Sequence, residues 1–258
     1  MKKYRYYLID VDRTLWDFDK NSERAICHLI GKYPHLDKAI CDGEGGDAGY
    51  KHIFFEKYDI LNHKLWAQYE SGELTKDKLR WYRFYAAFEL YGLHDEEFAK
   101  QFGDDYLAQM ICEKELIPGA REMLAHIESL GGKMAVLSNG FKEVQYHKLE
   151  RSGIRQYFSE VVISEEVGYQ KPDPNIFRVA LERLCGFTEA EDPSGWIEAK
   201  QATLMIGDDP TNDIIGAKEH GIPAIGVSWG YGKVEDMEKA GAMAIAHSME
   251  ELQALLLA

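Results

Sequence analysis

Short apolar segments bounded by turn residues recur along the chain, and each is typical of a buried β-strand. They lie at residues 4–9, 133–137, 160–163, 203–206, 224–227 and 242–246. From residue 118 onward, the segments between them repeat apolar residues with helical spacing, and several end at a glycine. Strands that alternate with helices form a parallel sheet covered on both faces. The pattern therefore predicts an α/β fold.

Two segments break this alternation. Residues 17–112 contain several apolar stripes with helical spacing and no convincing strand. We therefore expect a helical insertion there, in a core formed by residues 1–16 and 113–258. A module tethered at both ends to a core can hinge as a lid. The shorter segment, residues 187–200, is polar and is predicted to form a surface insertion between a helix and the next strand.

The composition is that of an ordinary soluble globular protein, with 45% hydrophobic and 29% charged residues. A formal charge of -14 repels polyanions and anionic lipid surfaces, so we expect neither a nucleic-acid polymer nor a membrane as a partner. Asp10 interrupts the first apolar segment before a signal-peptide core could form. The four cysteines are scattered, without metal-binding spacing, which favours reduced thiols in the cytoplasm.

Polar residues follow four of the predicted strands at the points where those strands end. Ligands of open parallel sheets bind beyond the carboxyl ends of the strands, so these residues should lie together. In chain order they are Asp10, Asp12 and Thr14, then Ser138, Asn139 and Gly140, then Lys171, and finally Asp208, Asp209 and Asp213. The sequence thus predicts a cluster of carboxylates with one lysine and small polar donors.

This set of residues indicates phosphate chemistry with a metal. Crowded carboxylates repel one another unless a cation lies between them, and oxygen ligands suit Mg²⁺, so we predict a magnesium site that Asp208 completes. A carboxylate can attack phosphorus to form an aspartyl-phosphate. Asp10 is the candidate nucleophile, because it directly follows the apolar strand. Asp12, two residues on, is the candidate general acid and base.

Small polar groups and the lysine are expected to bind the substrate and stabilise charge. The Ser138 hydroxyl and the Asn139 backbone N–H are predicted to bind phosphoryl oxygens, and Thr14 is also assigned to substrate binding. Lys171 is predicted to neutralise charge on Asp10 and on the transferring group. The predicted catalytic residues are therefore Asp10, Asp12 and Lys171, and the predicted substrate-binding residues are Thr14, Ser138 and Asn139.

Three residues keep two interpretations each. Asp213 either orients Lys171 or a metal-bound water, or only occupies the first turn of a helix, where acidic residues are favoured. Asp209 has the same two interpretations. Arg13 either lines the entrance to the site or faces solvent.

Four short motifs carry a family resemblance. DVDRT at 10–14, SNG at 138–140, KP at 171–172 and GDDPTND at 207–213 resemble the four motifs of the haloacid dehalogenase-like (HAD) hydrolase superfamily, in the same order. The resemblance covers the whole chain. It implies a Rossmann-like core with an inserted helical cap, and magnesium held by Asp10, the Asp12 carbonyl and Asp208. Dehalogenases of the superfamily do not keep the second aspartate of the first motif, so Asp12 implies a phosphatase.

The insertion resembles the cap of bacterial pyrimidine-type 5′-nucleotidases, through residues 14–19 and 66–84. This implies a small phosphorylated substrate, a nucleoside 5′-monophosphate. Aromatic residues of these segments, Trp16 and Phe18 among them, either stack on a nucleobase or pack within the protein. The alternatives are a sugar phosphatase or phosphomutase, a haloacid dehalogenase, and a receiver-like signalling module that stores its phosphate. The oligomeric state stays open.

Overall fold

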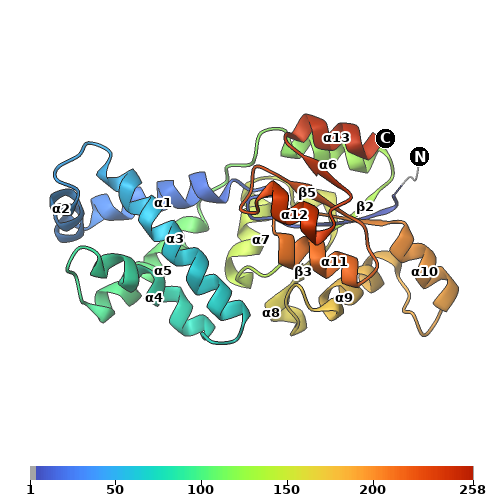
Figure 1. Cartoon of the computed structure of the whole chain (residues 1–258), viewed down its shortest axis with the longest axis horizontal. Coiled ribbons are helices and arrows are strands. Elements are labelled where there is room, and N and C mark those ends of the chain that lie inside the picture. Colours follow the sequence, from blue (N-terminus) through green and yellow to red (C-terminus); the bar gives the residue numbers. More distant parts are fainter. Residues whose placement is uncertain (1–3, 258) are drawn as a thin grey trace. The chain divides into compact units, whose positions relative to one another are not determined.

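The computed structural model describes residues 4–257, which divide into two compact units (Figure 1). An α/β unit contains the described residues up to Phe18 and those from Lys114 onward. A helical unit contains Asp19–Glu113. We predicted a helical insertion at residues 17–112, and the helical unit spans Asp19–Glu113.

A six-stranded sheet forms the centre of the α/β unit, in the order β3-β2-β1-β4-β5-β6, and every pairing is parallel. The strands are β1 (Tyr6–Ile9), β2 (Lys133–Ser138), β3 (Phe158–Ile163), β4 (Thr203–Gly207), β5 (Ala224–Val227) and β6 (Ala244–Ala246). Each overlaps one of the apolar segments, so the predicted α/β fold is confirmed. The strand order reverses between β1 and β4, where open sheets bind ligands. Asp10 lies at this position.

Helices cover both faces of the sheet (Figure 1). On one face α6 (Ala120–Ser129) lies beside α13 (Met249–Leu257); the other is covered by α9 (Pro174–Cys185), α11 (Gly216–Glu219) and α12 (Val234–Ala240). The connections also contain α7 (Lys142–Arg151), η1 (Arg155–Tyr157), α8 (Ser164–Val167), α10 (Pro193–Gln201) and the π-helical turn η2 (Pro210–Ile215).

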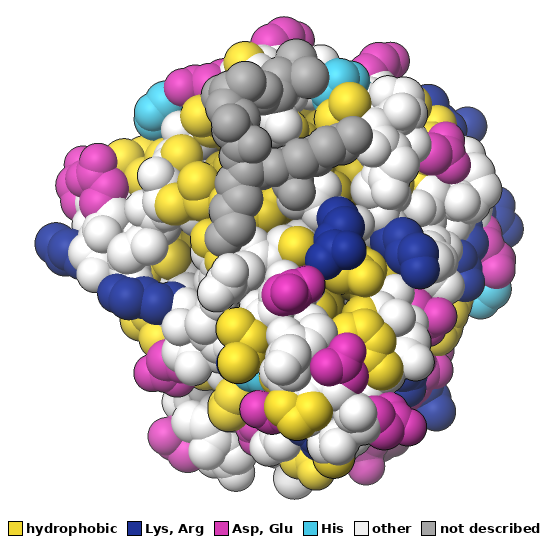
Figure 2. All heavy atoms as spheres, turned by 90° about the vertical axis from the view of Figure 1, so that its right-hand side faces the viewer, with side chains coloured by type: hydrophobic (Ala, Val, Ile, Leu, Met, Phe, Trp, Pro, Cys, Tyr) yellow, Lys and Arg dark blue, Asp and Glu magenta, His cyan; other side chains and the backbone are white. Residues whose placement is uncertain are grey.

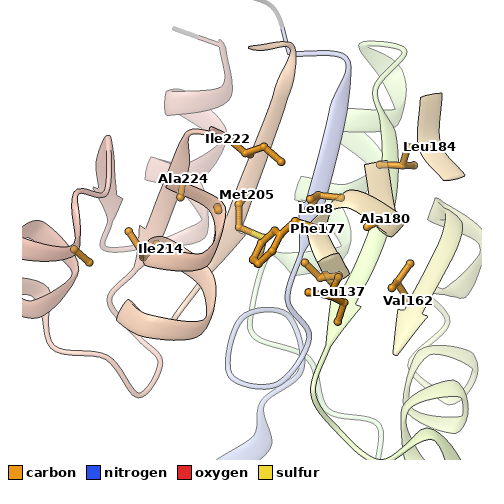
Figure 3. Packing of buried hydrophobic residues seen from close by; sticks show 14 of the residues in the cluster. Leu8, Leu137, Val162, Phe177, Ala180, Leu184, Met205, Ile214, Ile222 and Ala224 are labelled. Atoms are coloured by element: carbon orange, nitrogen blue, oxygen red, sulfur yellow. The ribbon is translucent and has the colours of Figure 1, made fainter. Parts of the chain in front are cut away.

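The sheet is anchored by apolar side chains that point to the same face. Leu8 is in register with Ala135 on β2 and with Met205 on β4, and all three are fully buried. Phe177 from α9 packs among them (Figure 3). Burying one such side chain stabilises the fold by about 1.5–3 kcal/mol. These contacts fix β1, and therefore hold the residues that follow it in place.

The prediction of a surface insertion at residues 187–200 is wrong for part of the segment. It contains most of α10, which is capped by Asp192 through a hydrogen bond from the Gly195 N–H. Trp196 is fully buried and packs with Leu181 and Ala199. A single large aromatic residue can attach a short helix to the core even when its other residues are polar.

The helical unit consists of α1, which begins at Phe18, and four further helices. They are α1 (Phe18–Lys32), α2 (Pro34–Gly43), α3 (Tyr50–Glu70), α4 (Lys76–Glu89) and α5 (Glu96–Met110). Aromatic rings fill its interior: Tyr58 stacks on Phe84 with 5.1 Å between ring centroids, and Phe84 also contacts Phe102. Phe84 therefore packs inside this unit, the second of the two interpretations given to the aromatic residues.

Acidic and basic side chains are interspersed on the face of the molecule drawn in Figure 2. The coloured residues of that view form no continuous basic surface. Between residues 4 and 257, no helix combines the length and the apolar character needed to cross a membrane.

Candidate active site

A buried network surrounds Asp10 at the carboxyl end of β1. Lys171, in the loop before α9, donates from Nζ to Asp10 Oδ1 at 2.8 Å and to Asp213 Oδ1 at 2.7 Å. The side chains of Lys171, Asp10 and Asp213 are 3%, 9% and 1% exposed. Burying charges is costly unless they are paired with good geometry. Both interpretations of Asp213 have a contact in the structure: its Oδ1 accepts from Lys171, and its Oδ2 accepts from the Asp209 backbone N–H at 3.0 Å, at the start of η2.

The carboxylates here outnumber the ammonium group that pairs with them. Asp10, Asp208 and Asp213 each offer an oxygen atom, and these atoms lie within 4.8 Å of one another. Asp10 Oδ2 is buried and has no hydrogen-bond partner among residues 4–257. Three carboxylates against one lysine, with one carboxylate oxygen left over, fit a hard divalent cation such as Mg²⁺.

The protonation of the cluster reflects this excess of negative charge. Burial raises the pKa of Asp10, although Lys171 opposes the shift. Burial and the neighbouring Asp10 raise the pKa of Asp208 well above its ordinary value. Burial raises the pKa of Asp213 to about 7, again opposed by Lys171. Burial alone would lower the pKa of Lys171, but the charges of Asp10 and Asp213 outweigh it and raise that pKa. A bound cation would favour the ionised carboxylates.

Asp208, after β4, is held by a loop that follows β5. The Tyr231 N–H donates to Asp208 Oδ2 at 2.7 Å. A Cβ atom on Gly230 would lie 2.2 Å from Asp208 Cβ, so only glycine permits this close approach. We did not predict a role for this loop, residues 228–232, because the predicted site residues come from the connections after the first four strands. The available signal was the pair Gly230 and Gly232, shortly after the fifth apolar segment.

The residues after β2 organise the site through Lys171. The Asn139 side chain accepts from the Lys171 backbone N–H at 2.8 Å and donates to the Lys171 carbonyl at 3.0 Å. Ser138 Oγ accepts from the Gly140 N–H at 3.0 Å. We had predicted a role for the Asn139 backbone; the structure shows in addition that its side chain binds the backbone of Lys171.

Thr14 and Asp209, two of the predicted site residues, differ in the hydrogen bonds that their side chains make. Thr14 is fully buried, and its hydroxyl has no hydrogen-bond partner within the described part of the chain. Asp209 instead caps η2, where its carboxylate accepts from the N–H groups of Thr211 and Asn212, both at 2.8 Å. The contacts of Asp209 thus fit the capping interpretation, whereas Thr14 has an unused donor beside Asp10.

Asp12 belongs to a second network, which our sequence reasoning missed. Its carboxylate is 25% exposed, and it accepts from Lys148 Nζ at 2.5 Å and from Gln145 Nε2 at 2.7 Å. Both donors are side chains of α7. Neither belongs to a motif, and lysine and glutamine on a helix usually face water, so the sequence pattern gave no signal for them.

The aromatic residues next to this network are packed against cations. Trp16 is fully buried, and Lys148 Nζ lies 4.4 Å from the centroid of its ring. This burial leaves no face of Trp16 free to stack on a nucleobase. Arg13 has a positive φ of 63°, and its guanidinium lies 4.6 Å from the centroid of the Phe18 ring.

The sequence and the fold place the chain in a known family. Residues 4–221 match the family model of the haloacid dehalogenase-like hydrolases. The chain belongs to this family, which confirms the resemblance drawn from the four motifs and the prediction that the protein is a hydrolase.

Two curated enzymes and one crystal structure are similar to this chain over most of its length. Pyrimidine 5′-nucleotidase PynA from Streptococcus pneumoniae is 30% identical over 223 residues, 86% of this chain and 83% of PynA. Phosphoserine phosphatase from Thermus thermophilus is 36% identical over 242 residues, 90% of this chain and 91% of that enzyme. The crystal structure of the HAD-hydrolase YfnB from Bacillus subtilis, bound to magnesium, is similar with a TM-score of 0.78 and 25% identity over 100% of both chains. The predicted likeness to pyrimidine nucleotidases is thereby confirmed.

Proposed function

We propose that this chain is a magnesium-dependent phosphomonoesterase that acts through an aspartyl-phosphate on Asp10, with a nucleoside 5′-monophosphate as substrate. One observation carries the proposal: Lys171 holds one oxygen of the buried Asp10 carboxylate, and the other oxygen has no partner among the described residues. A carboxylate fixed in this way has an unused oxygen with which to attack phosphorus. The four unpaired cysteines fit the cytoplasm as its compartment.

The reaction consists of two displacements on phosphorus. In the first, an oxygen of Asp10 bonds to phosphorus, the bond from phosphorus to the ester oxygen breaks, and Asp12 gives its proton to the departing alcohol. In the second, Asp12 takes a proton from water, the water oxygen bonds to phosphorus, and the bond to Asp10 breaks. Phosphate is released and both aspartates return to their initial states.

Residues around Asp10 support the transfer. Lys171 stabilises the negative charge that develops on the phosphoryl group, and Asp213 and Asn139 keep it in place. The buried hydroxyl of Thr14 and the N–H groups after β2 are available to phosphoryl oxygens. Asp10, Asp208 and the Asp12 carbonyl would hold Mg²⁺, which supplies further charge neutralisation when bound.

Asp12 separates this reaction from dehalogenation and from phosphate storage. A haloacid dehalogenase expels halide, which needs no proton, whereas an alkoxide leaving group does. A receiver-like module keeps its phosphoryl group, but Asp12 lies next to Asp10 and can activate water. The partly exposed carboxylate of Asp12 is consistent with proton exchange with water.

Two relatives support two substrate classes. Similarity to PynA over most of both chains supports a pyrimidine nucleoside 5′-monophosphate. The higher identity to a phosphoserine phosphatase supports the phosphate ester of a small hydroxy amino acid as the second candidate. Both are small phosphorylated metabolites, as the sequence predicted.

A substrate screen tests the proposal. Phosphate release from uridine 5′-monophosphate, phosphoserine and glucose 6-phosphate is measured with Mg²⁺ and with EDTA, and the substrates are ranked by kcat/KM. We expect uridine 5′-monophosphate to exceed the others by at least about tenfold, and EDTA to abolish turnover. Phosphoserine in first place would establish the second candidate. No release from any of these esters would refute the phosphomonoesterase.

A further inference from the structure

We propose that Lys148 and Gln145 are positioning residues that aim the Asp12 carboxyl group at the leaving oxygen. They would thereby determine how well the enzyme cleaves esters whose leaving groups require protonation. The inference rests on the proposed phosphomonoesterase function, and it assigns a role to two side chains outside the four family motifs.

The two donors engage both oxygens of Asp12 at once. Lys148 Nζ contacts Oδ1 at 2.5 Å, and Gln145 Nε2 contacts Oδ2 at 2.7 Å. The donors are three residues apart on α7, so they lie on the same face of the helix. Because each oxygen of the Asp12 carboxyl group has its own donor, the two donors together fix the orientation of the plane of that group.

The Lys148 side chain is buried, unlike that of a surface lysine. Its side chain is 4% exposed and lies over the rings of Trp16 at 4.4 Å and Phe18 at 5.4 Å. Trp16 in turn pairs with the catalytic loop, because its carbonyl accepts from the Arg13 N–H at 2.8 Å and it forms a bridge with Asp12. The segment that carries Asp12 thus also supplies the aromatic rings against which Lys148 packs.

Gln145 reaches Asp12 only because a glycine makes room for it. A Cβ atom on Gly140 would lie 1.9 Å from Gln145 Nε2. The Gln145 side chain is buried, yet its Oε1 atom has no hydrogen-bond partner between residues 4 and 257. A glutamine buried only for packing would be poorly satisfied here, so its contact with Asp12 is the feature that accounts for its position.

Asp12 needs this support because it lies on a loop and its carboxylate is partly exposed. A free carboxylate there would sample several rotamers, and restricting them before the reaction lowers the entropic cost of proton transfer. A displacement of about 1 Å in a catalytic group can lower a rate on the order of 100-fold.

Two esters whose leaving groups differ in their need for a proton can separate the positioning of Asp12 from other effects of a substitution. A 4-nitrophenolate departs without a proton, whereas the benzyl alkoxide needs one, and the two esters are similar in size. The ratio kcat/KM reports the steps up to departure of the leaving group, so later hydrolysis of the phosphoenzyme does not mask the effect. Neither ester contains a nucleoside, so the test does not depend on the substrate class.

The experiment compares benzyl phosphate with 4-nitrophenyl phosphate on the full chain with Mg²⁺. Lys148→Met should lower kcat/KM about 100-fold for benzyl phosphate and less than tenfold for 4-nitrophenyl phosphate. Gln145→Leu should show the same selectivity with about a tenfold loss, and Lys148→Arg should recover part of the loss. Lys142→Met, an exposed lysine of the same helix, is the matched control and should behave as the wild type.

Equal losses for both esters, or no loss in the Lys148 and Gln145 variants, would overturn the positioning role. Circular dichroism checks that each variant folds; if Lys148→Met does not, Gln145→Leu decides the outcome by the same comparison. Wild-type protein that hydrolyses neither ester, and that also releases no phosphate from uridine 5′-monophosphate, phosphoserine or glucose 6-phosphate, would instead overturn the proposed function, and the inference with it.

Discussion

The first motif contains two aspartates, Asp10 and Asp12, and each is paired with a different lysine. The two lysine–carboxylate networks differ in how deeply they are buried. Around Asp10, Lys171 and Asp213 are almost completely buried. Around Asp12, Lys148 is buried as well, but the carboxylate itself remains partly exposed. A nucleophile gains from fixed, water-free surroundings, whereas a group that passes protons between an alcohol and water has to remain accessible.

The networks also differ in charge. The Asp10 network, together with Asp208, has more carboxylates than ammonium groups and fits an added cation. In the Asp12 network one carboxylate pairs with one lysine, so no added cation is required. We therefore expect magnesium to act on the first network and to leave the second largely unaffected.

The largest expected effect is that of Asp10→Asn. Replacing the nucleophile with its neutral isostere should lower kcat about 10⁴-fold or more while the fold is retained. Phosphate release and thermal unfolding are measured together, with the exposed Asp236→Asn as a control. Retention of more than about a tenth of wild-type turnover would place the nucleophile elsewhere.

A second comparison removes the lysine from each network. Lys171→Met leaves Asp10 and Asp213 without their cation in a buried site, which should lower the free energy of unfolding by about 3–5 kcal/mol. Lys148→Met should cost less, because the Asp12 carboxylate keeps contact with water. Urea unfolding of both variants in EDTA measures the difference. Equal costs would mean that burial does not distinguish the two networks.

The excess of carboxylates in the Asp10 network should make the stability of the protein depend on pH and on magnesium. Burial raises the pKa of Asp213 from 3.8 to about 7, so the folded chain binds more protons than the unfolded chain within that window. Without metal, the contribution of this group to the free energy of unfolding should therefore fall as the pH rises from about 4 to 7.

Magnesium requires ionised ligands, so its stabilising effect should be larger at about pH 8 than at about pH 5. At 100 times its Kd it should add about 2.7 kcal/mol. Thermal unfolding with Mg²⁺ and with EDTA at both pH values measures this, and Lys148→Met should respond as the wild type does. A larger stabilisation at the lower pH would contradict the metal site.

The smallest expected effect concerns Asp209. Asp209→Ala removes the cap of η2 and should cost about 1 kcal/mol of stability, with kcat changed less than threefold. Asp209→Asn keeps a capping side chain and should be close to the wild type. A loss of turnover in Asp209→Ala without a loss of stability would instead assign Asp209 to the catalytic network.

The two networks also differ in how far the sequence predicted them. Asp10 and Asp208 follow short apolar segments within two residues, and Lys171 lies in the connection after the third segment. The parallel sheet brings the ends of its strands together, so the positions of these residues after predicted strands indicated them. Lys148 and Gln145 come from a helix whose rotation about its axis depends on packing against the sheet. The buried Trp196 was missed for the same reason. Tertiary packing, not local pattern, determines which face of a polar helix turns inward.

The most direct measurement of the central claim is the covalent intermediate itself. The enzyme is mixed with substrate labelled with ³²P, quenched in acid within a single turnover, and digested, and the labelled peptide is identified. The account predicts acid-stable, hydroxylamine-sensitive label on the peptide that contains Asp10, and none in Asp10→Asn. Turnover of wild-type enzyme with no label on the chain, or label on another residue, would contradict it.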